Sequence, residues 1–156
     1  MTPNVDDRLA SVIRALTEVI LPHLPPEASL AQEQVHLSVG HLQILRAQID
    51  AIPAFEREEL EDAIAIGKAL CGAVSGGAET GKALAALATS VAAAGGEDVR
   101  GERKVISTAV AVLVRAVSAD GDAAGKAALS AIILEHEHPR AQKDRHWFAP
   151  FGFDTL

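Results

Sequence analysis

Apolar residues recur every three or four positions through most of the chain, which is the spacing of one face of an α-helix. The first such set ends before Pro22 and comprises Leu9, Val12, Ile13, Leu16 and Ile20. Asp6 or Asp7 can cap the helix that this set predicts, and Pro22 stops it. After the linker HLPPEAS, a second and longer helix is expected from about Glu27 to Ile52, because Pro53 breaks it.

The middle of the chain predicts two more helices. Pro53 can open a third helix that runs to about Val74, with acids near its start that suit the positive end of a helix dipole. These acids are Glu56, Glu58, Glu59, Glu61 and Asp62. SGGAE predicts a turn, and TGKALAALATSVAAA predicts a fourth helix that Gly95 and Gly96 close.

The last third of the chain is less regular. VISTAVAVLVRAV (residues 105–117) is rich in valine, which favours a strand, but it is longer than a usual strand and lacks clean alternation. We expect a buried helix there, with a strand as the alternative. SADGD then turns the chain into a last helix from about Asp122 to His136, which Pro139 ends.

Because the predicted elements are helices, the sequence predicts an all-α fold. The short connections between them imply that neighbouring helices are antiparallel. We expect a single-domain antiparallel bundle of five or six helices over residues 1–138, followed by an irregular tail at residues 139–156. The tail contains four of the five aromatic residues of the chain: Trp147, Phe148, Phe151 and Phe153. So much apolar surface is not expected to stay in water, so the tail should pack on the bundle, on a partner subunit or over a ligand pocket.

Composition narrows the function classes. The 156 residues carry a net charge of −7 without a cluster of Lys and Arg on one face, which argues against nucleic-acid binding. Cys71 is the only cysteine, so no internal disulfide is possible, which fits a reducing compartment. No apolar run approaches the roughly 20 residues that span a bilayer, and the N-terminus lacks the apolar core of a signal peptide. We therefore expect a cytoplasmic protein without a membrane or nucleic-acid partner.

Three histidines near the C-terminus raise the question of a metal site. His136 and His138 would point the same way in an extended turn, and His146 could fold back to complete a zinc-like set. Solvated side chains at the end of a helix explain them better, because a protonated imidazole complements the helix dipole. We therefore favour no metal and no cofactor for this chain.

The spacing Glu-x-x-His, which is typical of di-iron helical bundles, occurs at Glu33–His36 and at Glu135–His138. Each residue advances a helix by about 100°, which places His36 opposite the apolar arc of its own helix, facing solvent. Glu18 lies opposite the apolar residues of the first helix for the same reason. A di-iron site is therefore not expected.

The segment GGAETGKA (residues 76–83) has the glycine and lysine spacing of a phosphate-binding loop. Ala83 stands where that motif needs Ser or Thr to hold magnesium, and the predicted element before it is a helix rather than a strand. A glycine turn between two helices accounts for the segment.

Small residues elsewhere have packing explanations. Cys71 falls on the apolar arc of its helix without a basic neighbour to activate it, so we interpret it as a core residue and not as a nucleophile. The triplet Gly-Lys-Ala occurs at residues 67–69, 81–83 and 125–127. Gly and Ala at these positions should allow helices to approach closely.

The second helix carries polar residues inside its apolar arc. Gln34, His41 and Gln48 are spaced by seven, and Ser38 lies near them. An unpaired buried polar group costs about 1–3 kcal/mol, so these side chains need partners. A hydrogen-bonded network, or a polar seam at a subunit contact that fixes register, would supply them. A pocket between helices is the functional alternative, with Gln34, Ser38, His41 and Gln48 orienting a ligand and Trp147 near its mouth.

The stretches DRLASVIRALTEVILPHLPP, HLQILRAQIDAIP and EELEDAIA resemble a group of small, uncharacterised bacterial helical proteins. The resemblance covers residues 1–70 and consists largely of hydrophobic spacing. Genes of that group often lie beside those of acyl-CoA dehydrogenases and phosphotransferase-like kinases, which implies an accessory role near acyl-CoA metabolism. It implies no catalytic residue.

These features predict a non-enzymatic interaction or accessory module that forms a homodimer. The second helix and the tail are the expected contact surfaces, and the tail could also bind a different protein. A bundle that binds a small apolar or acyl ligand is the alternative. A metal-dependent enzyme that uses His136, His138 and His146 is the third hypothesis.

Overall fold

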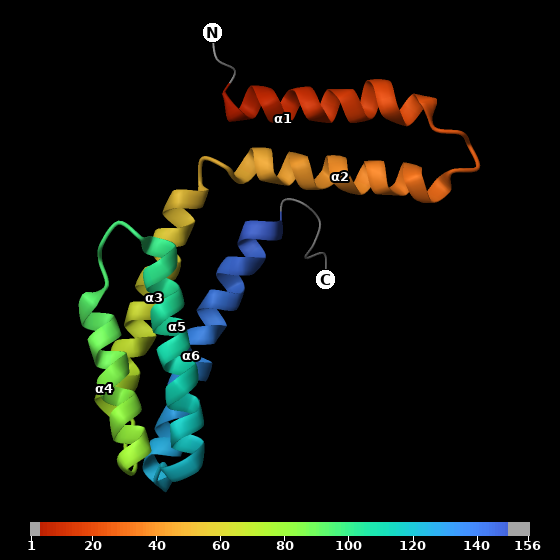
Figure 1. Cartoon of the computed structure of the whole chain (residues 1–156). Coiled ribbons are helices and arrows are strands. Elements are labelled where there is room, and N and C mark those ends of the chain that lie inside the picture. Colours follow the sequence, from red (N-terminus) through yellow and green to blue (C-terminus); the bar gives the residue numbers. More distant parts are fainter. Residues whose placement is uncertain (1–3, 150–156) are drawn as a thin grey trace. The chain divides into compact units, whose positions relative to one another are not determined.

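Helices account for most of residues 4–149, which are the residues that this computed structural model describes (Figure 1). No strand occurs among them, so the prediction of an all-α fold is confirmed, and residues 105–117 lie within a helix. None of the described helices combines the length and apolar character that crossing a membrane requires. The chain divides into two compact units, Met1–Ile52 and Pro53–Leu156. The single bundle expected over residues 1–138 stays a prediction.

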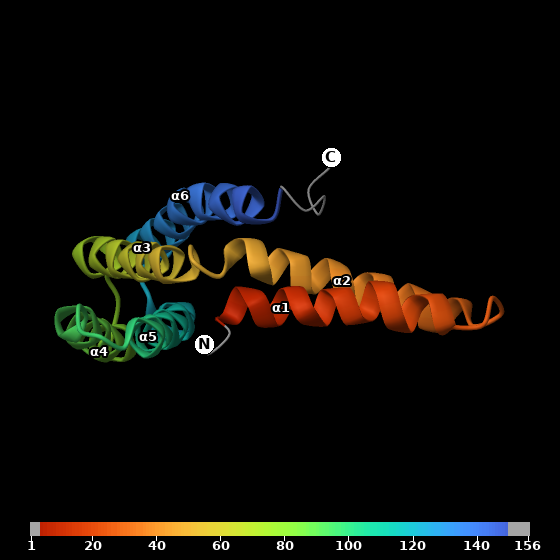
Figure 2. The same cartoon turned by 90° about the horizontal axis from the view of Figure 1, so that it is seen from above.

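The first unit is a helical hairpin (Figure 2). α1, Val5–Arg14, continues as a π-helical stretch, Ala15–Ile20, and a 3-10 turn, Leu21–His23. α2, Ser29–Gln48, runs back beside it, close to the range expected from the sequence. Val39 of α2 is the only buried residue among the described residues of this unit.

The start of α1 differs from the prediction. Asn4 is the cap, because its Oδ1 accepts the N–H of Asp7 at 2.7 Å while the Asp7 carboxylate accepts the N–H of Asn4 at 3.4 Å. Asp6 instead accepts two hydrogen bonds from the guanidinium of Arg46 in α2, at 2.5 and 2.9 Å. Asp6 and Asp7 therefore do not cap the helix, since one pairs across the hairpin and the other supports the Asn4 cap.

The second unit is built from four helices: α3 Ile52–Ala73, α4 Ala78–Ala93, α5 Val99–Asp120 and α6 Ala123–Phe148. Consecutive helices alternate in direction, and α3 and α6 form a layer beside α4 and α5 (Figures 1 and 2). Apolar side chains from all four helices, together with Val74 just after α3, make one core. Its buried residues are Leu60, Leu70, Val74, Ala83, Leu87, Ile106, Leu113, Val117 and Leu129.

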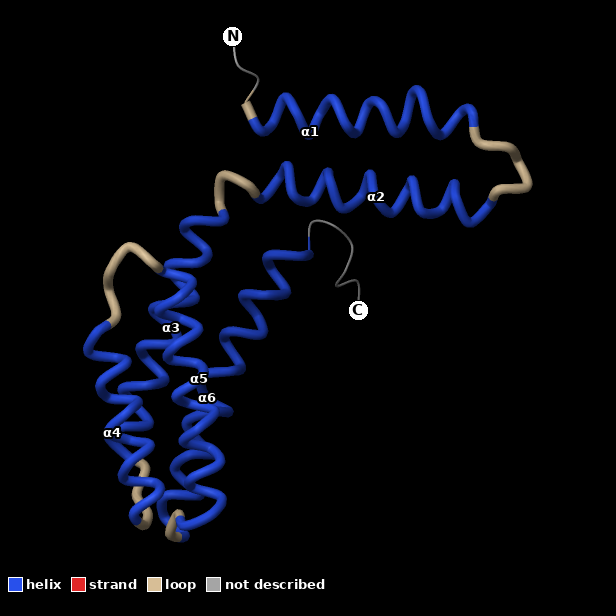
Figure 3. The backbone as a smooth tube through the Cα atoms, viewed as in Figure 1, coloured by secondary structure: helices blue, strands red, loops and turns tan. Residues whose placement is uncertain are grey.

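The last helix does not end at Pro139. α6 runs through this proline to Phe148, so the expected helix end near His136 is wrong, and so is an irregular tail over residues 139–149 (Figure 3). Proline inside a helix removes a backbone hydrogen bond and clashes with the preceding turn, which costs about 3 kcal/mol. Contacts from the following turns to α3 offset that cost. Residues 150–156, with Phe151 and Phe153, lie outside the described residues.

Two of the three Gly-Lys-Ala glycines lie where another segment approaches closely. A Cβ on Gly125 would lie 1.9 Å from the carbonyl oxygen of Ser75, and one on Gly67 would lie 2.6 Å from Cγ2 of Val91. A Cβ on Gly81 would meet no such atom within 4 Å. The prediction of close approach is therefore confirmed for Gly67 and Gly125 and wrong for Gly81.

Candidate functional site

Glu59 lies in the N-terminal half of α3 and is only 5% exposed, which is rare for a carboxylate. The first turn of α3 contains no acid, because the helix already begins at Ile52. The expectation that the acids of residues 56–62 match the positive end of the helix dipole is therefore wrong for this helix. Cations from two other helices compensate Glu59 instead.

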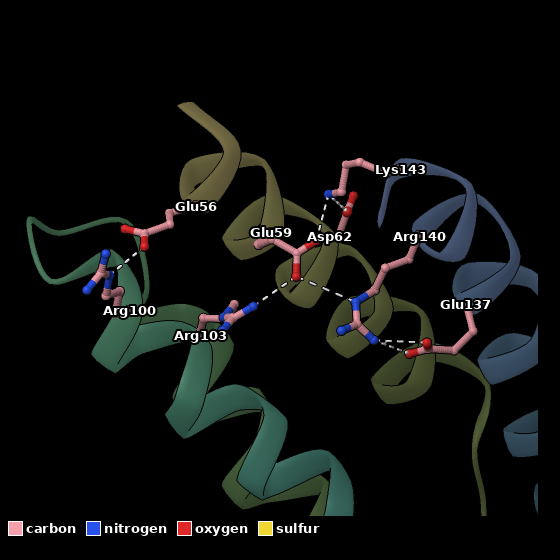
Figure 4. A network of polar contacts seen from close by, with 8 residues as sticks. All are labelled: Glu56, Glu59, Asp62, Arg100, Arg103, Glu137, Arg140 and Lys143. Carbon is pink, nitrogen blue, oxygen red and sulfur yellow. Dashed lines mark hydrogen bonds and ion pairs between the residues drawn. The ribbon is translucent and has the colours of Figure 1, made fainter. Parts of the chain in front are cut away.

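Three cations surround the Glu59 carboxylate (Figure 4). Nη1 of Arg103, from α5, donates to Oε2 at 2.8 Å, and Nε of Arg140, from α6, lies 3.5 Å from the same oxygen. Nζ of Lys143, one turn further along α6, lies 2.9 Å from Oε1. Oε1 is fully buried, and within residues 4–149 it has this ion-pair partner but no well-aligned hydrogen-bond donor. One buried carboxylate thus joins α3, α5 and α6.

The pKa values in this network reflect a balance between burial and charge. Burial would raise the pKa of Glu59, but the contact and charge of Lys143, together with Arg140 and Arg103, outweigh it and hold the pKa below its usual range. Burial likewise opposes the charged forms of Lys143 and Arg140, yet their acidic neighbours raise the pKa of both. Glu59, Lys143 and Arg140 are therefore charged near neutral pH.

Two outer ion pairs extend the network, and a separate pair of Glu56 with Arg100 lies near it (Figure 4). Asp62 also pairs with Lys143, and Glu137 accepts from Nη1 of Arg140 at 2.9 and 3.2 Å. Glu56 pairs with Nε of Arg100 at 2.5 Å, but the Arg100 side chain is 72% exposed. Exposed pairs contribute little to stability, so Glu59 is the energetic centre of the set.

An aromatic contact lies beside the network. The rings of Phe55, in α3, and Trp147, near the end of α6, stack with centroids 4.3 Å apart and planes inclined by 25°. Nζ of Lys143 lies 5.6 Å from the centre of the Phe55 ring, within the range of a cation–π contact. Trp147 therefore packs on its own chain, on the single aromatic residue that does not belong to the C-terminal segment.

A cleft of about 380 Å³ adjoins Glu59 between α3, α5 and α6. Its lining residues are Glu59, Asp62, Ala63, Ile66, Arg103, Ile106, Ser107, Val110, Ala111, His136, Glu137 and Arg140. A smaller hollow of about 230 Å³ lies on the other side of Arg140, between α3 and α6. Asp62, His136 and Arg140 border both.

The segment that resembles a phosphate loop is occupied by a carboxylate of the chain itself. Asp120, at the end of α5, accepts the N–H groups of Glu79 at 2.7 Å and Thr80 at 3.0 Å, and also the Thr80 hydroxyl at 2.6 Å. The Thr80 hydroxyl bond is the largest of the contacts that lower the pKa of Asp120. The N–H groups of Glu79 and Thr80, in the first turn of α4, are thus already paired. A glycine turn between two helices is what the structure shows here.

The polar residues predicted on the second helix do lie together on α2. Gln34, Ser38 and His41 are exposed, and Gln48 is half-buried. The Ser38 hydroxyl donates to the Gln34 carbonyl one turn before it, at 2.8 Å. Trp147 belongs to the other unit, where it stacks on Phe55, and a shared ligand site of these residues stays a prediction.

The C-terminal histidines all lie on one continuous helix. His136 is half-buried beside the cleft, whereas His138 and His146 are exposed, and Nδ1 of His146 lies 2.9 Å from the Gln142 carbonyl oxygen. The extended turn that would align His136 with His138 does not form. No group of three or more potential metal ligands, including the Glu-x-x-His pairs, comes together among residues 4–149.

Cys71 packs against the core, as expected from its place on α3. Its Sγ lies 3.9 Å from the carbonyl oxygen of Leu84, and burial raises the pKa of the thiol. An activated nucleophile needs the opposite shift.

The sequence did not predict that Glu59 is buried among cations, nor that Arg103, Arg140 and Lys143 are its partners. Glu59 lies three residues before Asp62 in a run of acids, and nothing in their order separates the buried one from the exposed ones. The nearest signal is the pair Arg140 and Lys143 just after Pro139, which the prediction of an irregular tail set aside.

Comparisons with known proteins return no relative for this chain: no protein-family model, no curated protein and no solved structure matches it. The resemblance of residues 1–70 to small bacterial helical proteins therefore stays a hypothesis.

Proposed function

We propose that this chain is a non-enzymatic interaction module that forms a homodimer through α2. The observation that carries the proposal is the order of side chains on the face of α2 that α1 leaves uncovered. Leucine or isoleucine alternates with a polar residue at steps of four and three: Leu30, Gln34, Leu37, His41, Ile44 and Gln48. This spacing is that of the contact seam between two helices of a coiled coil.

This seam faces away from the hairpin's own interior. At about 100° per residue, Leu30, Leu37 and Ile44 lie about 140–180° around α2 from Val39, the one buried residue found within residues 4–52. Leu30 is 69% exposed and Leu37 is 49% exposed. α2 therefore has one apolar face toward α1 and a second, opposite face without a covering helix in its own unit.

The hairpin also has too small an interior to be expected to stand alone. A row of exposed valines, spaced by seven residues, lies along α1 and its π-helical extension: Val5, Val12 and Val19. Two helices with one buried side chain among residues 4–52 recover little apolar area, whereas two hairpins packed on each other would bury both rows. A second copy of the chain would supply such a layer.

The polar positions of the seam fit a contact between identical helices. A polar residue in a coiled-coil seam lowers stability but fixes register and the number of chains. In a symmetric dimer, Gln34, His41 and Gln48 of one copy meet the same set of the other, where amide and imidazole groups can pair. We assign these residues to the dimer seam, with Ser38 at its edge.

The test is a charge placed in the seam, compared with the same charge beside it. Leu37→Glu should abolish dimerisation, because two carboxylates would be buried at the contact. His36→Glu adds the same side chain on an exposed face of α2, outside the seam, and should leave the dimer intact. Light scattering on the eluting protein measures the mass of each. Dimers of equal stability in both variants would place the contact elsewhere.

A further inference from the structure

One titratable side chain lies in the proposed seam of α2. Of the three polar seam positions, Gln34 and Gln48 stay neutral at every pH, whereas a histidine such as His41 ordinarily gains a charge in weak acid. His41 is exposed in the single chain and lies about 160° around α2 from Val39, on the side without a covering helix. A contact on this side would therefore transfer His41 from water into the seam.

Among residues 4–52, no acid of α2 lies where it would neutralise a protonated His41. The residues one turn before and one turn after it are uncharged: Leu37, Ser38, Ile44 and Leu45. A charge on His41 would therefore have only apolar groups and a hydroxyl beside it on its own helix.

The other charged or titratable residues near His41 in the sequence are too distant or face another way. Glu33 precedes His41 by eight residues, which is about 12 Å along the helix axis, and Asp50 lies past the end of α2. His36 and Arg46 are each five residues away and therefore lie about 140° around the helix from His41.

Nor does α1, over Val5–Arg14, place an acid beside His41. Asp6 of α1 pairs with Arg46, and the two helices run in opposite directions (Figure 2). α1 therefore comes level with His41 near Ser11. The charged residues of α1 within one turn of that level are Asp7, Arg8 and Arg14. α1 packs on the Val39 side of α2, so the body of α2 separates these groups from His41.

We infer that mild acid dissociates the homodimer and that His41 is the group that responds to pH. This inference rests on the proposed α2 dimer. When like residues of two copies meet, the charged group closest to one His41 is the other. Two imidazolium groups would repel each other in a largely apolar contact without an acid to compensate them. The dimer then binds fewer protons than two separate copies, so association weakens as the pH falls.

Proton linkage gives the size of the effect. A histidine with the ordinary midpoint of about pH 6.5 is about 10% protonated at about pH 7.5 and about 97% protonated at about pH 5. If the dimer accommodates neither imidazolium, each histidine weakens association about thirtyfold at the lower pH, and the two together weaken it about a thousandfold. Partial accommodation of the charge lowers this factor, and at least about tenfold should remain.

Sedimentation equilibrium of the full chain at about pH 7.5 and at about pH 5 tests the inference. The dissociation constant should rise at least about tenfold between the two conditions. Equal dissociation constants would overturn the inference and leave the proposed dimer standing. A monomer already present at the higher pH would overturn both.

Matched variants identify the group that titrates. His41→Gln makes the third polar position like Gln34 and Gln48 and should dimerise equally at both pH values. His36→Gln removes a histidine from α2 outside the seam and should keep the acid response of the wild type. If His41→Gln stays monomeric, His41→Leu takes its place in this comparison. An acid response that persists in the His41 variant, or that disappears in His36→Gln, would overturn the role of His41.

Unfolding is distinguished from dissociation by the same samples. The pKa of Glu59 lies below its ordinary value of 4.5, so the ion pairs of the second unit should persist at about pH 5. Circular dichroism should therefore give the same helix content at both pH values. Loss of helix at about pH 5 in the wild type and in His41→Gln alike would assign the dissociation to unfolding and overturn the inference.

Discussion

Lys143 holds its ammonium nitrogen 2.9 Å from Oε1 of Glu59 and so ties the part of α6 beyond Pro139 to α3. Arg140 reaches the other oxygen of the same carboxylate, and the Phe55–Trp147 stack adds a contact one turn later. These contacts explain why the helix continues through a proline. They also make Glu59 the residue on which the C-terminal part of the second unit most depends.

Replacing Glu59 by glutamine should lower the free energy of unfolding by about 1–3 kcal/mol, because a neutral amide cannot compensate the surrounding cations. Chemical denaturation measures this change. Glu56→Gln is the matched control on the same helix, and its effect should stay within about 0.5 kcal/mol because its partner Arg100 is largely exposed. Equal losses in the two variants would contradict the special role of Glu59.

The contribution of Glu59 should disappear in acid. Its pKa in the folded protein lies below the ordinary value of 4.5, so the stabilisation is complete above that value and is lost as the pH falls through the folded pKa. The difference in unfolding free energy between wild type and Glu59→Gln should be constant down to about pH 5 and shrink below it. Denaturation curves across this range provide the test, and a difference that persists to about pH 2 would refute it.

Gly81 and Gly125, which begin two copies of the Gly-Lys-Ala triplet, should have opposite effects on stability when replaced by alanine. Gly125→Ala should destabilise the protein by about 3 kcal/mol or more, because the new Cβ would lie 1.9 Å from a backbone oxygen of Ser75. Gly81→Ala should instead raise stability by about 0.5–1 kcal/mol, since its Cβ would enter open space on α4. Thermal unfolding of both variants is sufficient. A destabilised Gly81→Ala would show that its surroundings are closer than described.

Helix positions could be predicted from the sequence because apolar spacing and Pro or Gly boundaries act locally. Pro139 shows where that reasoning fails. The local rule that proline ends a helix was overridden by contacts to residues some eighty positions earlier, such as Asp62 with Lys143. Glu59 could not be distinguished from its acidic neighbours for the same reason, since its burial depends on where α5 and α6 pack.

The stack of Phe55 on Trp147 should be energetically coupled. A double-mutant cycle with Phe55→Leu and Trp147→Leu should give a coupling free energy of about 0.5–1.5 kcal/mol. The single and double variants are compared by chemical denaturation. Strict additivity of the two substitutions would mean that the rings do not stabilise each other.

His41 should limit the strength of the dimer while fixing its register. His41→Leu replaces a polar seam residue by an apolar one and should tighten self-association, since polar residues in such seams cost stability. Analytical ultracentrifugation at decreasing protein concentration would detect the change as a lower dissociation constant. Weaker association of His41→Leu would indicate that His41 makes a specific bond across the contact.

The central claim is that α2 joins two copies of this chain, and sedimentation equilibrium of the wild-type protein tests it most directly. At micromolar concentration the account predicts a mass of about 33 kDa, twice the 16.3 kDa of one chain, and a mass near 16.3 kDa for Leu37→Glu. A wild-type mass of 16.3 kDa throughout the micromolar range would contradict it.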